Sequence, residues 1–168
     1  ILVEGASDKM LLQKALALKG QTQFGITNGH GSNLDTLASK LNDVDISVLV
    51  VVDDDASGKA CKAKIVRIGG SYSDRNVFTI RDLVGGIVAD GTIEDTLGKN
   101  YVESKFKELY CSRYSEAECD ITLDEAAPVV GQMKACLHQN KKADADKFIG
   151  DIKNKLANEF APAKSSFR

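Results

Sequence analysis

The stretch of sequence that decides the fold is Ile46-Ser47-Val48-Leu49-Val50-Val51-Val52-Asp53-Asp54-Asp55-Ala56-Ser57-Gly58. Its apolar, β-branched first half is typical of a strand buried on both faces. Open α/β sheets carry their chemistry just beyond the carboxyl ends of such strands, so we expect Asp53 and Asp55 to project into one crevice. Because these carboxylates repel each other in a partly desolvated site, the pattern calls for a cation.

A second apolar segment ends in the same way. Ile1-Leu2-Val3 runs into Glu4-Gly5, and Asp8 follows four residues after Glu4. A helix that begins near Ser7 would place Glu4 and Asp8 on one side of its N-terminus. Two strand ends would then present acidic groups to one site, which is the geometry expected of a divalent-metal centre with oxygen ligands.

Strands and helices are expected to alternate along the first half of the chain. Because such alternation implies a parallel sheet with right-handed crossovers, the predicted class is α/β, with a mostly parallel four-stranded sheet flanked by helices. Residues 81–98 read as loop, and the rest of the chain reads as helical. The expected strands are 1–3, 24–27, 46–52 and 76–80, and the expected helices centre on 12–19, 34–41, 59–68, 102–109, 130–137 and 149–160, with Ser32 capping the second and His30 in the loop before it.

Composition excludes several classes of protein. The 168 residues fit one domain with a real core, and the net charge of −2 gives no overall basic footprint for nucleic acid, although lysines gather late in the chain. The four cysteines form no C-x-x-C pair, so we expect no zinc site. We expect the cysteines to be reduced thiols. No signal peptide or membrane-length apolar run is present, which favours a cytoplasmic protein. The abrupt start inside a strand suggests a piece of a longer chain.

Two other motif interpretations compete for the acidic run, and a third concerns the glycines at 29 and 31. A calcium EF-hand loop beginning at Asp53 would need a glutamate at its twelfth position, where Lys64 stands, and is rejected. A haloacid-dehalogenase phosphatase would use Asp53 as nucleophile, but it leaves the other acidic segments without a role. The glycines at 29 and 31 form only a partial nucleotide fingerprint, and no Walker A sequence exists, so ATP hydrolysis by this chain alone is not expected.

Taken together, Leu2-Val3-Glu4-Gly5-x-Ser7-Asp8 and Val51-Val52-Asp53-x-Asp55-x-Ser57-Gly58 resemble the two hallmark motifs of a TOPRIM domain, whose fold is Rossmann-like. Gly91-Thr92-Ile93-Glu94-Asp95-x-Leu97 is most similar to the acidic segment of OLD-family (overcoming lysogenization defect) nucleases. The resemblance covers most of residues 1–100 and implies a catalytic core at 1–98, with a C-terminal helical extension at 99–168 packed on it.

The resemblance implies a metal-dependent DNA endonuclease with a two-metal mechanism that uses Mg²⁺ or Mn²⁺. Glu4 would also transfer a proton, and a lysine of the helical part would assist catalysis; Lys142 is the first choice and Lys147 the second. Asp54 is expected to point away from the metal and to cap the following helix. The metal ligands that the resemblance implies are Glu4, Asp8, Asp53, Asp55, Ser57 and Glu94.

The expected partner is DNA, and no membrane association is expected. Full OLD proteins carry an ATPase before this domain, so an ATPase domain or subunit outside these residues is a further expected partner, and the full-length protein is a candidate homo-oligomer. Two alternatives to the nuclease stay open: a non-catalytic TOPRIM module that binds metal and nucleic acid or a partner protein, and a phosphatase that depends on Asp53 but not on Glu4.

Overall fold

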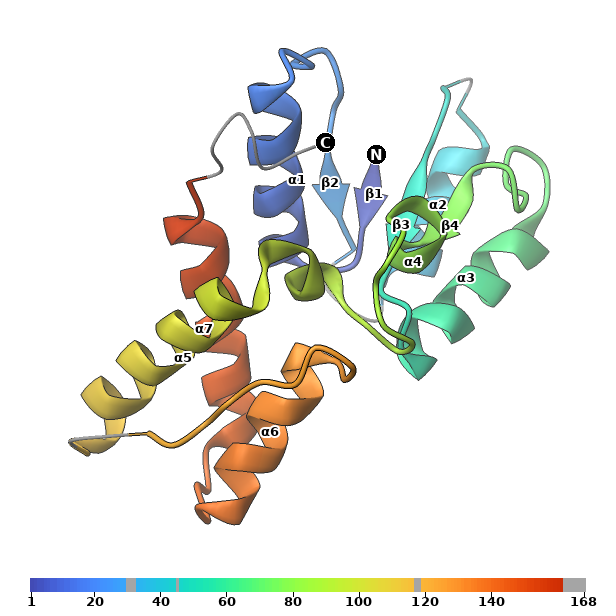
Figure 1. Cartoon of the computed structure of the whole chain (residues 1–168). Helices are drawn as coiled ribbons and strands as arrows, with labels where there is room; N and C mark the ends of the chain where they lie inside the picture. Colours follow the sequence, from blue (N-terminus) through green and yellow to red (C-terminus); the bar gives the residue numbers. More distant parts are fainter. Residues whose placement is uncertain (30–32, 45, 117–118, 162–168) are drawn as a thin grey trace.

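A computed structural model describes residues 1–29, 33–44, 46–116 and 119–161 of the chain (Figure 1). The expectations for His30 and for Ser32 as a helix cap fall outside these residues. The elements, in chain order, are β1 (Leu2–Val3), α1 (Ala6–Leu18), β2 (Thr27–Asn28), α2 (Leu34–Asn42), β3 (Val50–Val52), α3 (Ala56–Ile68), β4 (Val77–Thr79), α4 (Ile80–Leu83), the 3₁₀ helix η1 (Ile93–Leu97), α5 (Lys99–Tyr114), α6 (Val129–Gln139) and α7 (Ala145–Glu159).

The four strands form one parallel sheet in the order β2-β1-β3-β4, which confirms the predicted fold class. From β1 the chain first moves outward to β2 and then returns past β1 to β3. The carboxyl ends of β1 and β3 therefore lie at the point where the strand order reverses, the usual position of a binding crevice in open α/β sheets.

Side-chain alternation along the short strands divides the core into two layers. Val50 and Val52 pack with residues of α2 and α3 on one face of the sheet. Val3 and Val51 pack on the other face with Leu11 of α1 and with Ala157 of α7. Figure 1 shows α1 beside α7 on that side, and the two helices are in direct contact. The last helix of the chain is thus part of the layer that covers the sheet.

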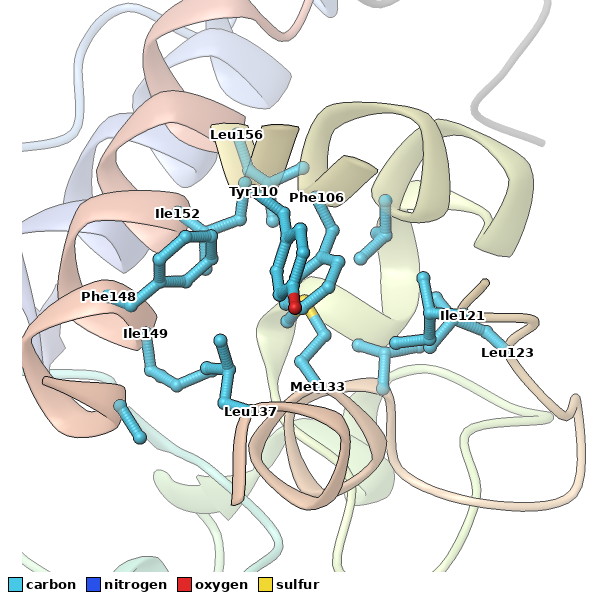
Figure 2. Close-up of a cluster of buried hydrophobic side chains, with 13 residues drawn as sticks. Phe106, Tyr110, Ile121, Leu123, Met133, Leu137, Phe148, Ile149, Ile152 and Leu156 are labelled. Atoms are coloured by element: carbon cyan, nitrogen blue, oxygen red, sulfur yellow. The ribbon is translucent and has the colours of Figure 1, made fainter. Parts of the chain in front are cut away.

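A separate hydrophobic cluster joins α5, α6 and α7 (Figure 2). Phe106, Phe148, Ile152 and Leu156 are fully buried in it, and Tyr110 nearly so. Each such side chain contributes roughly 1.5–3 kcal/mol when it leaves water. Because α7 packs into this cluster and onto the sheet layer, it connects the two. The division of the chain at residue 98 remains a prediction.

Lys14 of α1 fixes the end of α7. Its ammonium donates hydrogen bonds to the carbonyl oxygens of Ala157 (2.8 Å), Asn158 (2.6 Å) and Phe160 (3.0 Å). A cation at this place satisfies carbonyl groups that the helix leaves unpaired and offsets the negative end of the helix dipole. These bonds join the end of α7 to α1, beside the apolar contacts that the two helices share.

All four strands differ from the predictions in their bounds, by one residue at an end for β1 and at both ends for β4, and by more for the other two. The second strand is Thr27–Asn28 rather than 24–27, and the third pairs only over Val50–Val52 rather than 46–52. The segment 81–98, expected to be loop, contains η1 and most of α4. Within the described residues, no helix is both long and apolar enough to cross a membrane.

Candidate metal centre

Strand register brings Glu4 and Asp53 together. Val3 is the partner of Val51, so the first residue after β1 lies level with the last residue of β3. The backbone N–H of Asp53 donates to Glu4 Oε1 at 3.0 Å. The end of β3 thereby holds the Glu4 carboxylate at the edge of the crevice and leaves its second oxygen for other partners.

Gly58 allows this close approach. A Cβ atom at this position would overlap the carbonyl oxygen of Asp53 and would lie 2.8 Å from Glu4 Oε1. Gly58 is buried in the first turn of α3, and its backbone N–H donates to Asp55 Oδ1 at 2.8 Å. The glycine of the acidic motif is therefore required by packing against the strand ends.

Asp55 and Asp8 both sit at helix N-termini. Asp55 is the N-cap of α3, so the cap function expected of Asp54 belongs to its neighbour, and that expectation was wrong. Asp8 is buried at the third position of α1, where it accepts from the Gly5 N–H (2.7 Å) and from the Ser7 hydroxyl (3.2 Å). Helix N-termini favour negative charge, which offsets part of the repulsion between the carboxylates.

Glu94 approaches the same place from η1. Ile93 N–H donates to Asp53 Oδ1 at 3.0 Å, which fixes the start of η1 against the end of β3. Glu94 is fully buried; its Oε2 accepts from the Thr92 hydroxyl at 2.7 Å, whereas its Oε1 has no hydrogen-bond partner. An unpaired buried carboxylate oxygen is costly, and it marks a place that a cation would satisfy.

Asp95, the next residue, has a structural role. Its Oδ2 accepts from the Thr92 N–H (2.7 Å) and its Oδ1 from the Val129 N–H (3.0 Å) at the start of α6. One carboxylate therefore caps η1 and ties it to the helical region.

Asp54 points into a different set of contacts, as expected from the alternation of side chains at a strand end. Its buried Oδ2 accepts from the Asp90 N–H (3.1 Å) and lies 3.3 Å from Lys59 Nζ and 3.9 Å from Arg81 Nη1. Although burial acts to raise the pKa of Asp54, these donors and the Thr79 hydroxyl hold it below its usual value.

Lys153 of α7 is the cation that faces the carboxylates. Its Nζ lies 3.2 Å from Glu94 Oε2 and 3.9 Å from Asp53 Oδ2. The sequence analysis did not identify this residue. The signal was present, since Lys153 follows Ile149 by four residues and precedes Leu156 by three, which places a lysine within the apolar stripe of a helix.

The centre holds more carboxylates than cations, and the pKa values of its groups are shifted accordingly. Burial, followed by the charges of Asp8, Glu94 and Glu4, raises the pKa of Asp53 to about 8 despite Lys153. Burial also raises the pKa of Glu4 and of Glu94. Burial alone would lower the pKa of Lys153, but the neighbouring carboxylates raise it, so the lysine stays protonated.

The donor set fits a hard divalent cation, because all of its candidate ligands are oxygen atoms and all but the Ser57 hydroxyl are carboxylates. The geometry is not that of a finished site: among the residues that the structure describes, no group of three or more His, Cys, Asp or Glu side chains is arranged to hold a metal ion. Several of the carboxylates instead use one oxygen to accept a hydrogen bond from a backbone N–H, as described above. Binding of a metal ion at this place would therefore require rotation of these side chains.

Three of the expected site residues are not joined to this cluster. Lys142 forms an ion pair with Glu116 and lies over the Tyr114 ring at 4.2 Å, and Lys147 is exposed on α7. The structure therefore does not bring either lysine to the carboxylates, and Lys153 takes the place expected for them. Ser57 is exposed in the first turn of α3.

Comparison with known proteins identifies one family. Residues 1–55 match the model of the TOPRIM domain of overcoming lysogenization defect protein-like proteins. No curated protein matches the chain, and no solved structure does. The match confirms the resemblance over residues 1–55, and it indicates a metal-binding module related to nucleic acids. It includes Glu4, Asp8 and the run 53–55; Glu94 and Lys153 lie outside it.

Proposed function

We propose that this chain, whose first 55 residues match the OLD-like TOPRIM domain, is the catalytic part of a metal-dependent DNA endonuclease. The observation that carries the proposal is the convergence of carboxylates from β1, β3 and η1 on Lys153, with one buried oxygen of Glu94 left without a partner. Such an excess of negative charge destabilises the fold and is typical of a functional centre.

The residues that would hold Mg²⁺ or Mn²⁺ are Glu4, Asp53 and Asp55, with Asp8 and Glu94 completing a second position. Ser57 stays a proposed ligand that would act from the rim. When bound, two divalent cations stabilise the attacking and leaving oxygens of an in-line displacement at phosphorus.

Two side chains of the protein would assist the reaction, one by proton transfer and one by its positive charge. Because burial raises the pKa of Glu4 above its ordinary value, this carboxylate would accept a proton from an attacking water more readily than an exposed glutamate does. Lys153 keeps its positive charge among the carboxylates and would stabilise the charge that builds on the phosphate oxygens. We propose Lys153 for this role in place of Lys142 and Lys147.

DNA is the proposed substrate, although the chain as a whole is slightly acidic. The divalent cations and Lys153 would provide the positive charge at the point of cleavage. An ATPase domain or subunit, and self-association of the full-length protein in the cytoplasm, belong to the proposal as features of OLD-type proteins.

Nicking of supercoiled plasmid in the presence of Mn²⁺ or Mg²⁺ tests the proposal. We expect conversion to open circles that stops in EDTA and falls at least about 100-fold in Asp53→Ala, since removal of a metal ligand removes the site. Asp146→Ala is the matched control, because Asp146 is an exposed helical aspartate paired only with Lys134 among the described contacts. Nicking that persists in Asp53→Ala, or none at any protein concentration, would refute nuclease activity in this chain.

A non-catalytic metal and nucleic-acid binding module is the second candidate. The family match supports it, because an OLD-like TOPRIM domain over residues 1–55 indicates metal binding and a relation to nucleic acids but no particular reaction. Calorimetric binding of Mn²⁺ without cleavage would select it. Turnover of a small phosphate ester that survives Glu4→Gln but not Asp53→Ala would select the phosphatase instead.

A further inference from the structure

Asp54, between the two aspartates of the acidic motif, has contacts that the proposed catalysis does not use. Its side chain is only 6% exposed, and its Oδ2 meets donors from the loop after α4, from α3 and from α4, as described above. The Thr79 hydroxyl at the end of β4 also acts to lower the pKa of this carboxyl. A carboxylate with this many partners is a junction between elements rather than a solvent-facing side chain.

The junction holds the segment that leads to Glu94. The Asp54 backbone N–H donates to the Gly91 carbonyl at 2.9 Å, and its side chain accepts from the Asp90 N–H at 3.1 Å. Two residues later, Ile93 N–H donates to Asp53 Oδ1. Three hydrogen bonds therefore join residues 53–54 to residues 90–93.

The backbone between these bonds is held in a costly conformation. Asp90 has φ 59°, in the left-handed region that non-glycine residues rarely adopt. A Cβ atom at Gly91 would lie 2.7 Å from Ile87 Cγ2 and 2.9 Å from the Val88 carbonyl oxygen. A tight turn of this kind persists only when its surroundings stabilise it, and the Asp54 carboxylate is the charged group bound to it from the sheet.

We propose that Asp54 is a positioning residue that locks residues 90–93 onto the end of β3 and thereby fixes the carboxylates of Glu94 and Asp53 for cation binding. This inference rests on the proposed metal centre but not on cleavage. Partners of ligands at metal sites commonly change metal affinity 10- to 100-fold when removed.

The first test needs no metal. Hydrogen exchange of individual amides, followed by NMR in EDTA, reports whether Asp90 and Ile93 stay bonded. In Asp54→Ala we expect the exchange rate of both amides to rise at least about 10-fold. The turn at residues 90–93 can then open without breaking the charge-assisted hydrogen bond to the Asp54 carboxylate. Asp54→Asn retains an acceptor oxygen and should restore most of the protection.

Asp82→Ala is the matched control. Like Asp54, Asp82 accepts a backbone N–H and pairs with a lysine, but among the described residues its contacts are with Thr79 and Lys62 and not with residues 90–93. It should leave the Ile93 amide protected. Unchanged protection in Asp54→Ala, or equal loss in both alanine variants, would overturn the inference.

Calorimetry with Mn²⁺ then separates this inference from the proposed function. We expect the Mn²⁺ affinity of Asp54→Ala to be about 10- to 100-fold weaker than that of the wild type. The affinities of Asp54→Asn and Asp82→Ala should stay within about threefold of the wild type. If the wild-type chain does not nick DNA but Asp54→Ala loses amide protection and Mn²⁺ affinity, the nuclease proposal fails and the positioning role stands. If Mn²⁺ affinity is the same in Asp54→Ala and wild type, the positioning role fails even when nicking is observed.

Discussion

Replacement of Lys153 by methionine tests the charge balance of the candidate metal centre. Methionine keeps most of the apolar stem and removes the ammonium, which lies 3.2 Å from Glu94 and 3.9 Å from Asp53. At an effective dielectric constant of 20, Coulomb attraction over these distances is about 5 and about 4 kcal/mol. The cost of burying the three charges cancels much of this sum. Removal of one partner should therefore lower the free energy of unfolding by roughly 3–5 kcal/mol at high pH.

The loss should depend on pH, because the carboxylates left behind can take up protons. The pKa of Asp53 is already raised to about 8 and that of Glu94 is raised by burial, and loss of the lysine raises both further. A carboxyl whose pKa is higher in the folded than in the unfolded chain stabilises the fold at low pH, and this contribution is lost as the pH rises through the folded pKa. The free energy of unfolding of Lys153→Met should therefore be close to that of the wild type at pH 5. The difference between the two should be largest above pH 8.

Urea unfolding followed by circular dichroism in EDTA, at pH 5, 7 and 8.5, measures this difference. Lys142→Met is the matched control, since Lys142 is similarly covered but pairs with Glu116, whose pKa lies below its usual value. The control should show a smaller change that is constant over this pH range. If Lys153→Met lost the same free energy of unfolding at pH 5 and at pH 8.5, or if both variants lost equal amounts, the proposed charge balance would be refuted. In the plasmid assay, Lys153→Met should abolish nicking and Lys142→Met should not.

Three further outcomes follow from the geometry. Gly58→Ala should lower the free energy of unfolding by about 1–3 kcal/mol in urea titrations, since its Cβ would overlap the Asp53 carbonyl and crowd Glu4; Gly150→Ala, with open space around it, should be neutral or stabilising. Asp55→Ala should cost about 1 kcal/mol in metal-free protein through loss of the α3 cap, and an unchanged midpoint in urea would contradict the cap. Mg²⁺ affinity measured by calorimetry should fall up to about 10-fold per pH unit below pH 8, because the raised pKa of Asp53 means that the ion displaces a proton there; equal affinity at pH 6.5 and 8.5 would contradict this.

Local sequence patterns predicted the framework of this protein. An apolar strand followed by carboxylates, repeated at Glu4 and at Asp53, was enough to predict a parallel sheet with acidic groups at one edge, because the carboxyl ends of parallel strands meet there. Alternation of side chains also predicted that Asp54 turns away from its neighbours. These properties depend on residues a few positions apart, and strand and helix periodicity determine them.

Tertiary structure decided which side chains share the centre and how they are used. Lys153 reaches Glu94 because α7 packs its apolar face against α1 and the sheet, where Lys14 also bonds to the Ala157 carbonyl across 143 residues; no local pattern encodes these contacts. The choice of Asp55 as the cap of α3 depends likewise on where β3 ends and α3 begins. Sequence periodicity fixes which face of a helix is apolar, whereas the packing partner and the register of that face are decided by long-range contacts, and these set the charge around each carboxylate.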